Sequence, residues 1–176
     1  MTSSLCSPAG VPSLCSEADD GVVQDTVRWL ERAVIGLNLC PFAKGVHSKQ
    51  QIHYVVCRAN RAEDVLAVLE AELLTLAALP AQERDTSLLM LPDGMADFLD
   101  FNDFLDECES LLNSIGLAGV LQIASFHPQF RFAGTAEDDV SNCTNRAPYP
   151  TLHLLREESI DKAVEGMLLA FFNQGE

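Results

Sequence analysis

The sequence alternates between helical and strand-like apolar patterns, and this alternation limits the possible folds more than any other feature. Apolar residues recur at three- and four-residue steps, as on one face of a helix, in four segments: 21–37, 62–79, 98–115 and 160–174. Short apolar runs typical of strands occupy four others: 53–57, 87–91, 119–126 and 152–155. Helices and strands in this order favour an α/β domain with right-handed crossovers.

We therefore expect a single α/β domain. Its sheet should have four or more strands, be mainly parallel or mixed, and carry about four helices; an α+β sandwich is the alternative. The 176 residues, of which 48% are hydrophobic, suffice for one core, which residues 19–176 are predicted to form. Residues 1–18 are rich in Ser, Pro and Gly and are predicted to be a flexible tail.

The negative charge of the chain is concentrated in its middle. The 26 acidic and 11 basic residues give a net charge of −15, and residues 61–120 alone hold thirteen acids and two bases. Such a field repels polyphosphate, so no nucleic acid and no anionic membrane is expected as a partner. The acidic face of segment 98–115 is interpreted as a solvated surface, or as one that recruits a basic protein.

Compartment and cofactor use can also be predicted. Residues 1–20 lack the basic and apolar regions of a signal peptide, and no apolar run reaches the roughly 18 residues of a membrane span. A cytoplasmic protein is expected, with six reduced cysteines because none are spaced as CxxC. No glycine motif for a dinucleotide or a phosphate is present, and no cofactor is predicted. The oligomeric state is left open.

The stretch from Phe126 to Arg156 reads FHPQFRFAGTAEDDVSNCTNRAPYPTLHLLR and lies between two strand-like runs. Its many polar groups would go unpaired in an apolar core, so it must lie at a surface or line a cleft. A connection of this length is uncommon in a compact domain and is usually functional or disordered. We therefore place the candidate site on this stretch.

An anion site is the first hypothesis for this stretch. Three arginines offer planar charged groups that suit carboxylate or phosphate, and two asparagines add neutral donors and acceptors. The predicted substrate-binding residues are Arg131, Asn142, Asn145, Arg146 and Arg156. In the alternative, the arginines pair with neighbouring acids and hold the loop, while the asparagines cap turns.

Catalysis is the second hypothesis. His127 follows a strand, where a group with a pKa near 6.5 is well placed for proton transfer. Asp139 or Asp138 could orient it, and Cys40 or Cys143 could act as a nucleophile beside a cation that lowers its pKa. The alternative is that His127 is a hydrogen-bonding anchor of the loop.

Two further patterns are weaker. The tetrapeptide Cys40–Ala43, CPFA, resembles the active-site turn of some thioredoxin-fold glutathione transferases, which place the cysteine after a strand and at a helix N-terminus. Here a helix is expected before Cys40 instead, which argues against that resemblance. A metal site formed by His127, Cys143 and His153 is a further alternative, although their spacing matches no short zinc motif.

Four segments also resemble a known family. They are LNLCPFAK, FNDFLD, GVLQIASFHPQFRFAGT and SNCTNRAPYPTLHLLREESID, and in this order they are similar to the family called domain of unknown function 1415. The resemblance covers nearly all of the chain after the tail. It implies a single soluble, bacterial-type domain and assigns no catalytic residues.

The functional expectation rests on the residues alone. It is an enzyme, a hydrolase or group transferase, that acts on a small anionic molecule bound by the 126–156 stretch. A non-catalytic protein-interaction module with an acidic surface is the main alternative, and a metal-binding protein is the second.

Overall fold

The computed structural model describes the backbone of residues 17–173 and the side chains of residues 19–166. Its elements are α1 (Glu17–Trp29), η1 (Leu30–Ile35), α2 (Pro41–Ser48), β1 (Ile52–Val56), α3 (Ala62–Ala78), β2 (Thr86–Met90), α4 (Phe98–Ser114), β3 (Leu121–Phe126), η2 (Val140–Asn145), β4 (Thr151–Arg156) and α5 (Glu157–Asn173). Most of the predicted tail, residues 1–16, lies outside the described part of the chain, whereas residues 17 and 18 belong to α1.

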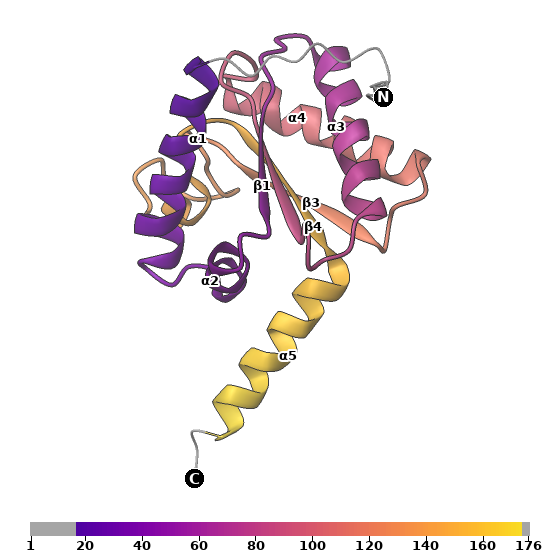
Figure 1. The fold of residues 1–176 in the computed structure, drawn as a ribbon. Coiled ribbons are helices and arrows are strands. Elements are labelled where there is room, and N and C mark those ends of the chain that lie inside the picture. The colour runs from indigo at the N-terminus through magenta and orange to yellow at the C-terminus, as the bar shows by residue number, and fades with distance from the viewer. Residues whose placement is uncertain (1–16, 174–176) are drawn as a thin grey trace, which may run out of the picture.

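The four strands form one mixed sheet in the order β1-β2-β4-β3 (Figure 1). β1 and β2 are parallel, whereas β4 lies between β2 and β3 and is antiparallel to both. The predicted α/β class and mixed sheet are thereby confirmed. Helical segments are more numerous than the four predicted, because α2 and the short 3-10 helix η2 were not expected.

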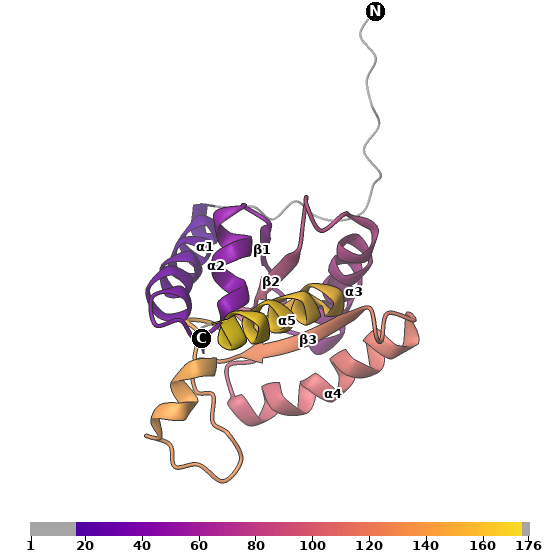
Figure 2. The same ribbon diagram turned by 90° about the horizontal axis from the view of Figure 1, so that it is seen from below.

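The helices cover the two faces of the sheet differently. α3 and α4 lie on one side of it, and α1 and α2 lie on the other (Figures 1 and 2). α5 continues directly from β4 and contacts α2. We call the side under α3 and α4 the leucine face, and the side under α1, η1, α2 and the start of α5 the cavity face.

The leucine face holds the main core. Alternate strand residues such as Leu89, Leu152 and Leu154 pack there against Leu69 and Leu73 of α3, and all five are 0% exposed. Burying a leucine side chain contributes about 1.5–3 kcal/mol. This face is the larger source of stability.

Polar contacts hold α1 against the cavity face. Arg58, which follows β1, donates to Asp19 of α1 at 2.9 Å and to Asp93 after β2 at 3.1 Å. Tyr149, just before β4, donates its hydroxyl proton to Asp25 of α1 at 3.0 Å. α1 is therefore joined to the ends of three strands that lie far apart in the sequence.

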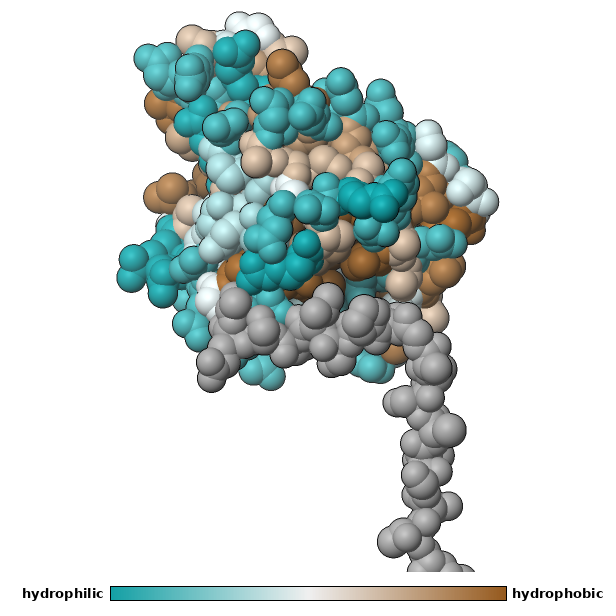
Figure 3. Space-filling view, turned by 90° about the horizontal axis from the view of Figure 1, so that it is seen from above, coloured by the Kyte–Doolittle hydropathy of each residue, from teal (hydrophilic) through white to brown (hydrophobic). Residues whose placement is uncertain are grey.

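The outer surface is rich in hydrophilic residues. In the view from above they cover much of the molecule, with apolar residues between them (Figure 3). Within the part of the chain that the structure describes, no helix is both long and apolar enough to cross a membrane.

Candidate functional site

His127 is an anchor of the loop that follows β3. Its ring is 1% exposed and packs against Phe98 and Phe101 of α4, with centroid distances of 5.4 and 5.2 Å. Nδ1 accepts the backbone N–H of Gln129 at 3.0 Å, so Nε2 carries the proton and donates it to the carbonyl of Met95 at 3.0 Å. Burial lowers the pKa of His127. Both nitrogens bind backbone groups, as in the anchor alternative, and leave none for a substrate.

Arg156 also binds the backbone. One terminal nitrogen of its guanidinium donates to the carbonyls of Leu76, Leu79 and Arg84 at 2.6, 2.7 and 2.9 Å. These carbonyls lie at and beyond the C-terminal end of α3, where a helix leaves its last carbonyls unpaired. Arg156 therefore joins β4 to the end of α3 and points away from the loop where an anion was predicted to bind.

The remaining arginines of the predicted anion site differ from each other. Arg146 donates to the carbonyls of Phe130 and Glu137 at 3.2 and 2.7 Å, which closes the loop on itself. Its side chain also lines an open depression together with Glu137 and Asp138, whose carboxylates would oppose an anion. Arg131 is exposed and has no hydrogen bond or ion pair to the described residues.

The two predicted asparagines stabilise turns. Asn142 is 0% exposed, accepts the backbone N–H of Phe132 at 2.9 Å and donates to the carbonyl of Ala136 at 2.8 Å. Asn145 donates to the carbonyl of Ser125 at 3.3 Å, next to the end of β3. Their amides are used inside the loop, in keeping with the alternative that they hold its turns.

The predicted catalytic residues lie apart. Asp139 begins η2 and accepts hydrogen bonds from the hydroxyl of Ser141 at 2.7 Å and from its backbone N–H at 2.9 Å, and these two bonds lower the pKa of Asp139. No hydrogen bond or ion pair joins Asp139 to His127, which packs on the leucine face. Cys143 is exposed, and Cys40 lies on the cavity face. The structure does not bring these side chains into one site.

The three side chains proposed to bind a metal do not lie together. His153 lies on the cavity face, whereas His127 lies on the leucine face and Cys143 lies in η2. Over the described residues, no three His, Cys, Asp or Glu side chains gather in a way that could hold a metal ion.

A cavity of about 390 Å³ on the cavity face was not foreseen from the sequence. Its walls come from α1, η1 and α2 on one side, from α5 on another, and from the sheet beneath. The lining residues are almost all apolar: Trp29, Leu30, Val34, Cys40, Pro41, Phe42, Ala43, Val46, Ile52, Thr86, Leu88, Gln122, Ala124, Phe126, His153, Leu155, Ile160, Ala163 and Val164. This cavity is the candidate site.

The small side chain of Ala124 on β3 leaves the space open. Ala124 pairs with His153 of β4, and its methyl group is all that covers the sheet at that point. Phe126 borders the same space and contacts the ring of Trp29 edge-on at a centroid distance of 5.2 Å. On the leucine face the neighbouring position of β4 is Leu154, which is fully buried.

The helical turn η1 shapes the opposite wall. It is a π-helical turn, in which the N–H of Gly36 donates to the carbonyl of Glu31 at 3.0 Å, five residues earlier. The same spacing recurs from Leu39 to Val34 at 2.8 Å. π-Helical turns are rare and often occur at functional sites. Here the turn places Leu30 and Val34 together against the cavity.

Cys40 lies at the wall of the cavity, directly before α2. Its backbone is extended, with φ −138° and ψ 111°, and Pro41 begins the helix. A helix was expected before Cys40, and η1 lies there, but α2, which starts immediately after Cys40, was not expected. The signal was Pro41, since proline is favoured in the first turn of a helix. A helical turn rather than a strand still precedes Cys40, unlike in the transferase pattern.

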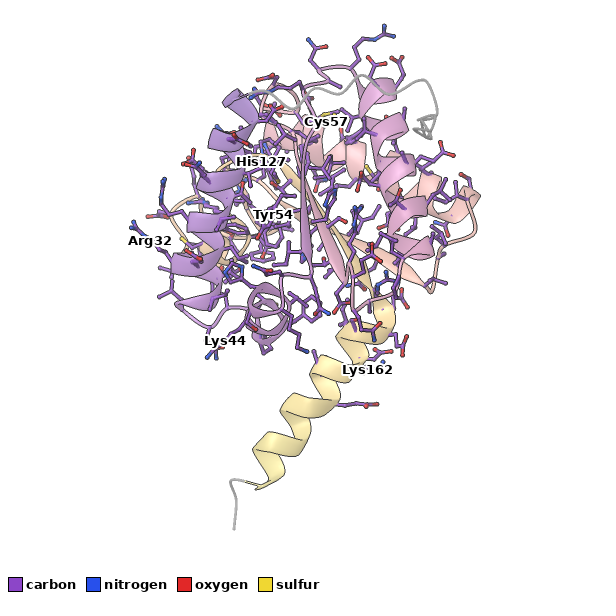
Figure 4. The ribbon with its side chains drawn as sticks, viewed as in Figure 1. Arg32, Lys44, Tyr54, Cys57, His127 and Lys162 are labelled. Carbon is purple, nitrogen blue, oxygen red and sulfur yellow. The ribbon has the colours of Figure 1, made fainter. Side chains whose placement is uncertain are left out.

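His153 is the main polar group of the cavity floor. Its Nε2 lies 2.8 Å from the hydroxyl oxygen of Thr86 on β2. Burial lowers the pKa of His153 to about 4, so the ring is neutral at pH 7. Charged groups lie on the outer surface instead, where Arg32 of η1, Lys44 of α2 and Lys162 of α5 are exposed (Figure 4).

Of the comparisons with known proteins, the one with family models finds a match. Searches among curated proteins and among solved structures find no match to this chain. A family model described as protein of unknown function (DUF1415) matches residues 21–169, from the first turns of α1 into α5. That range includes every strand, the long loop and all residues that line the cavity, and the chain belongs to the DUF1415 family.

Proposed function

We propose that this protein binds a small, mainly apolar organic molecule in the cavity between the sheet and helices α1, α2 and α5. The observation that carries the proposal is the cavity itself, with about 390 Å³ and an almost wholly apolar lining. Ligand sites typically measure roughly 300–1,000 Å³ and combine an apolar wall with a few polar groups. An apolar lining of this kind favours apolar ligands over charged ones.

Stability supports a ligand in this position. An empty apolar cavity costs stability, because the side chains around it lose packing contacts. An apolar guest restores those contacts and gains about 0.8 kcal/mol for each CH₂ group removed from water. On the opposite face of the sheet, the side chains of α3 and α4 pack directly against the strand leucines, so no ligand is required there to complete the packing.

Enzymatic activity on a small anionic substrate, which the sequence led us to expect, stays a prediction that does not depend on the cavity. Of the residues proposed to bind the anion, Arg131 is the one whose side chain makes no hydrogen bond or ion pair with the described residues. An anion-binding role for the loop would therefore rest mainly on Arg131. An acidic protein-interaction surface likewise remains a prediction.

Tryptophan fluorescence tests the proposal directly. The chain contains a single tryptophan, Trp29, and this residue lines the cavity. Titration with 1-methoxyadamantane, a rigid neutral cage that does not absorb at these wavelengths, should change its emission saturably and raise the thermal midpoint. The variant Ala124→Leu narrows the cavity and should weaken both effects, whereas Ala71→Leu on the exposed side of α3 should retain them.

Two results would contradict the proposal. One is an unchanged response in Ala124→Leu, with the variant shown to be folded by its circular dichroism. The other is stabilisation by phosphorylated or carboxylated metabolites alone, if it disappears in Arg131→Ala and persists in Ala124→Leu. The second result would favour the anion-binding loop.

Alkylation of Cys40 gives an independent measurement. Its thiol lines the cavity, whereas Cys143 is exposed in η2. A bound cage should slow the reaction of Cys40 with N-ethylmaleimide and leave that of Cys143 unchanged, as followed by peptide mass spectrometry. Equal protection of both cysteines, or of neither, would speak against a ligand in the cavity.

A further inference from the structure

One ring nitrogen of His153, in the lining of the cavity, has no hydrogen-bond partner among the described residues. The apolar wall of the cavity is interrupted by four polar side chains: Cys40, Thr86, Gln122 and His153. Gln122 is exposed and has access to water, and a thiol is a weak hydrogen-bonding group. The imidazole of His153 therefore determines which polar group a ligand can present to the floor.

Thr86 sets the tautomer of His153. The hydroxyl of Thr86 has one proton and donates it to the carbonyl of Leu154 at 2.6 Å. Towards Nε2 of His153, 2.8 Å away, the same oxygen can therefore only accept. Nε2 must carry the ring proton, and in a neutral imidazole this leaves Nδ1 as an acceptor.

Nδ1 of His153 is open to a ligand. No described residue donates a hydrogen bond to it. Among the described residues, the side-chain nitrogen and oxygen atoms that are both sealed and unpartnered are Tyr54 Oη and Ser87 Oγ. Nδ1 is not one of them, and His153 lines the cavity, so this atom can be reached from the cavity.

We propose that the cavity selects neutral apolar molecules that carry one hydrogen-bond donor, an O–H or an N–H group, which binds Nδ1 of His153. This inference rests on the proposed function and names the chemical class of its ligand. A carboxylate is rejected, because two acceptors would face each other inside an apolar wall and the charge would lose its hydration. A molecule without a donor leaves Nδ1 unpaired.

Three probes of one shape test the selection. They are 1-adamantanol, which has a donor, 1-methoxyadamantane, which has only an acceptor, and 1-adamantanecarboxylate, which is charged. Dissociation constants are measured at pH 7 from the fluorescence of Trp29. The alcohol should bind about tenfold more tightly than the ether, as expected for one net hydrogen bond, and the carboxylate should bind most weakly.

The variant His153→Phe keeps an aromatic ring and removes the acceptor. It should reduce the advantage of the alcohol over the ether to less than about twofold, with the affinity for the ether nearly unchanged. A matched control is Phe126→Leu, which alters the wall beside His153 and leaves Nδ1 in place. That control should lower both affinities and preserve their ratio.

The ring can also be observed in the folded wild-type protein, even if His153→Phe does not fold. Long-range ¹H–¹⁵N spectra should show the tautomer with the proton on Nε2, and addition of 1-adamantanol should shift the Nδ1 resonance. A proton on Nδ1 would overturn the inference. Equal affinities for alcohol and ether, or tighter binding of the carboxylate, would overturn the selection and leave binding in the cavity standing. Failure of all three probes to bind would overturn both.

Discussion

The two faces of the sheet are built from the same strands but are filled differently. On the leucine face, α3 and α4 pack against fully buried residues such as Leu89, Leu152 and Leu154. On the cavity face, the matching positions include Ala124 and His153, and a space of about 390 Å³ remains above them. One face stabilises the fold, and the other provides room for a ligand.

The difference follows from strand alternation. Successive residues of a strand point to opposite faces, so each strand can carry a leucine row on one side and smaller or polar residues on the other. β4 shows this within its six residues. Leucines at alternate positions point towards α3 and α4, and His153 between them points to the cavity.

The largest expected effect comes from adjacent leucines of β4. Leu154→Ala, on the leucine face, should lower the free energy of unfolding by about 4 kcal/mol, because it opens a void in a filled core. Leu155→Ala, beside the existing cavity, should cost about 2 kcal/mol, since fewer contacts are lost there. Urea denaturation measures both. Equal costs would show that the two faces are packed alike.

Substitution of Arg156 tests the hydrogen bonds that join β4 to the end of α3. Arg156→Met leaves three backbone carbonyls without their donor and should cost about 3 kcal/mol. Arg131→Met replaces an exposed guanidinium by an apolar group and should change stability by about 0.5 kcal/mol or less. Denaturation midpoints with unchanged slopes would report both values. A small effect for Arg156→Met would mean that its guanidinium is not needed to hold α3.

The pH dependence of stability tests the burial of His153. Its pKa of about 4 in the folded protein lies below the roughly 6.5 of an unfolded chain. Between these values the unfolded chain binds a proton that the folded protein does not, so stability falls as the pH drops from about 6.5 to about 4. The loss should be at most about 3 kcal/mol.

His153→Phe lacks this titration and should show a flatter profile over the same pH range. His127 and His53 also have lowered pKa values and act in the same direction, so the informative quantity is the difference between variant and wild type. Profiles that run parallel would indicate that water reaches the ring of His153 freely.

The smallest expected effect concerns added volume. Ala124→Leu places three more carbons in the cavity and should stabilise the protein by about 1 kcal/mol. Cys108→Leu adds volume to α4, where the site is already 0% exposed, and should destabilise by about 1–3 kcal/mol. Thermal midpoints compare the two variants. Destabilisation by both would show that the cavity closes in solution.

Local pattern accounts for most of the fold. Each of the four strands lies within two residues of its predicted position, and α3 and α4 begin where their periodicity begins. Gly116 follows directly after the predicted helical segment 98–115, and it adopts a positive φ of 74° just beyond α4. α2 was missed because eight residues are too few for a clear helical period, although Pro41 marked its start.

The predicted site illustrates the opposite case. Residues 127–150 of the polar stretch do form the loop between β3 and β4, but its last part, Thr151–Arg156, is β4, whose Leu152 and Leu154 belong to the core. The charged and amide groups of the stretch were assigned to a ligand, whereas most of them bind backbone carbonyls and N–H groups. The sequence contains the donors, but the carbonyls that they reach lie up to 80 residues away.

Periodicity therefore sufficed for the α/β class and for the position of each strand, because helical and strand repeats are local properties of the chain. The order of the strands, the partners of His127 and Arg156, and the cavity were set by tertiary packing. These features depend on how the strands and helices pack in space, and therefore on residues that are far apart in the sequence. Ala124 and His153 are 29 positions apart, and only the pairing of β3 with β4 brings them together beneath an open space.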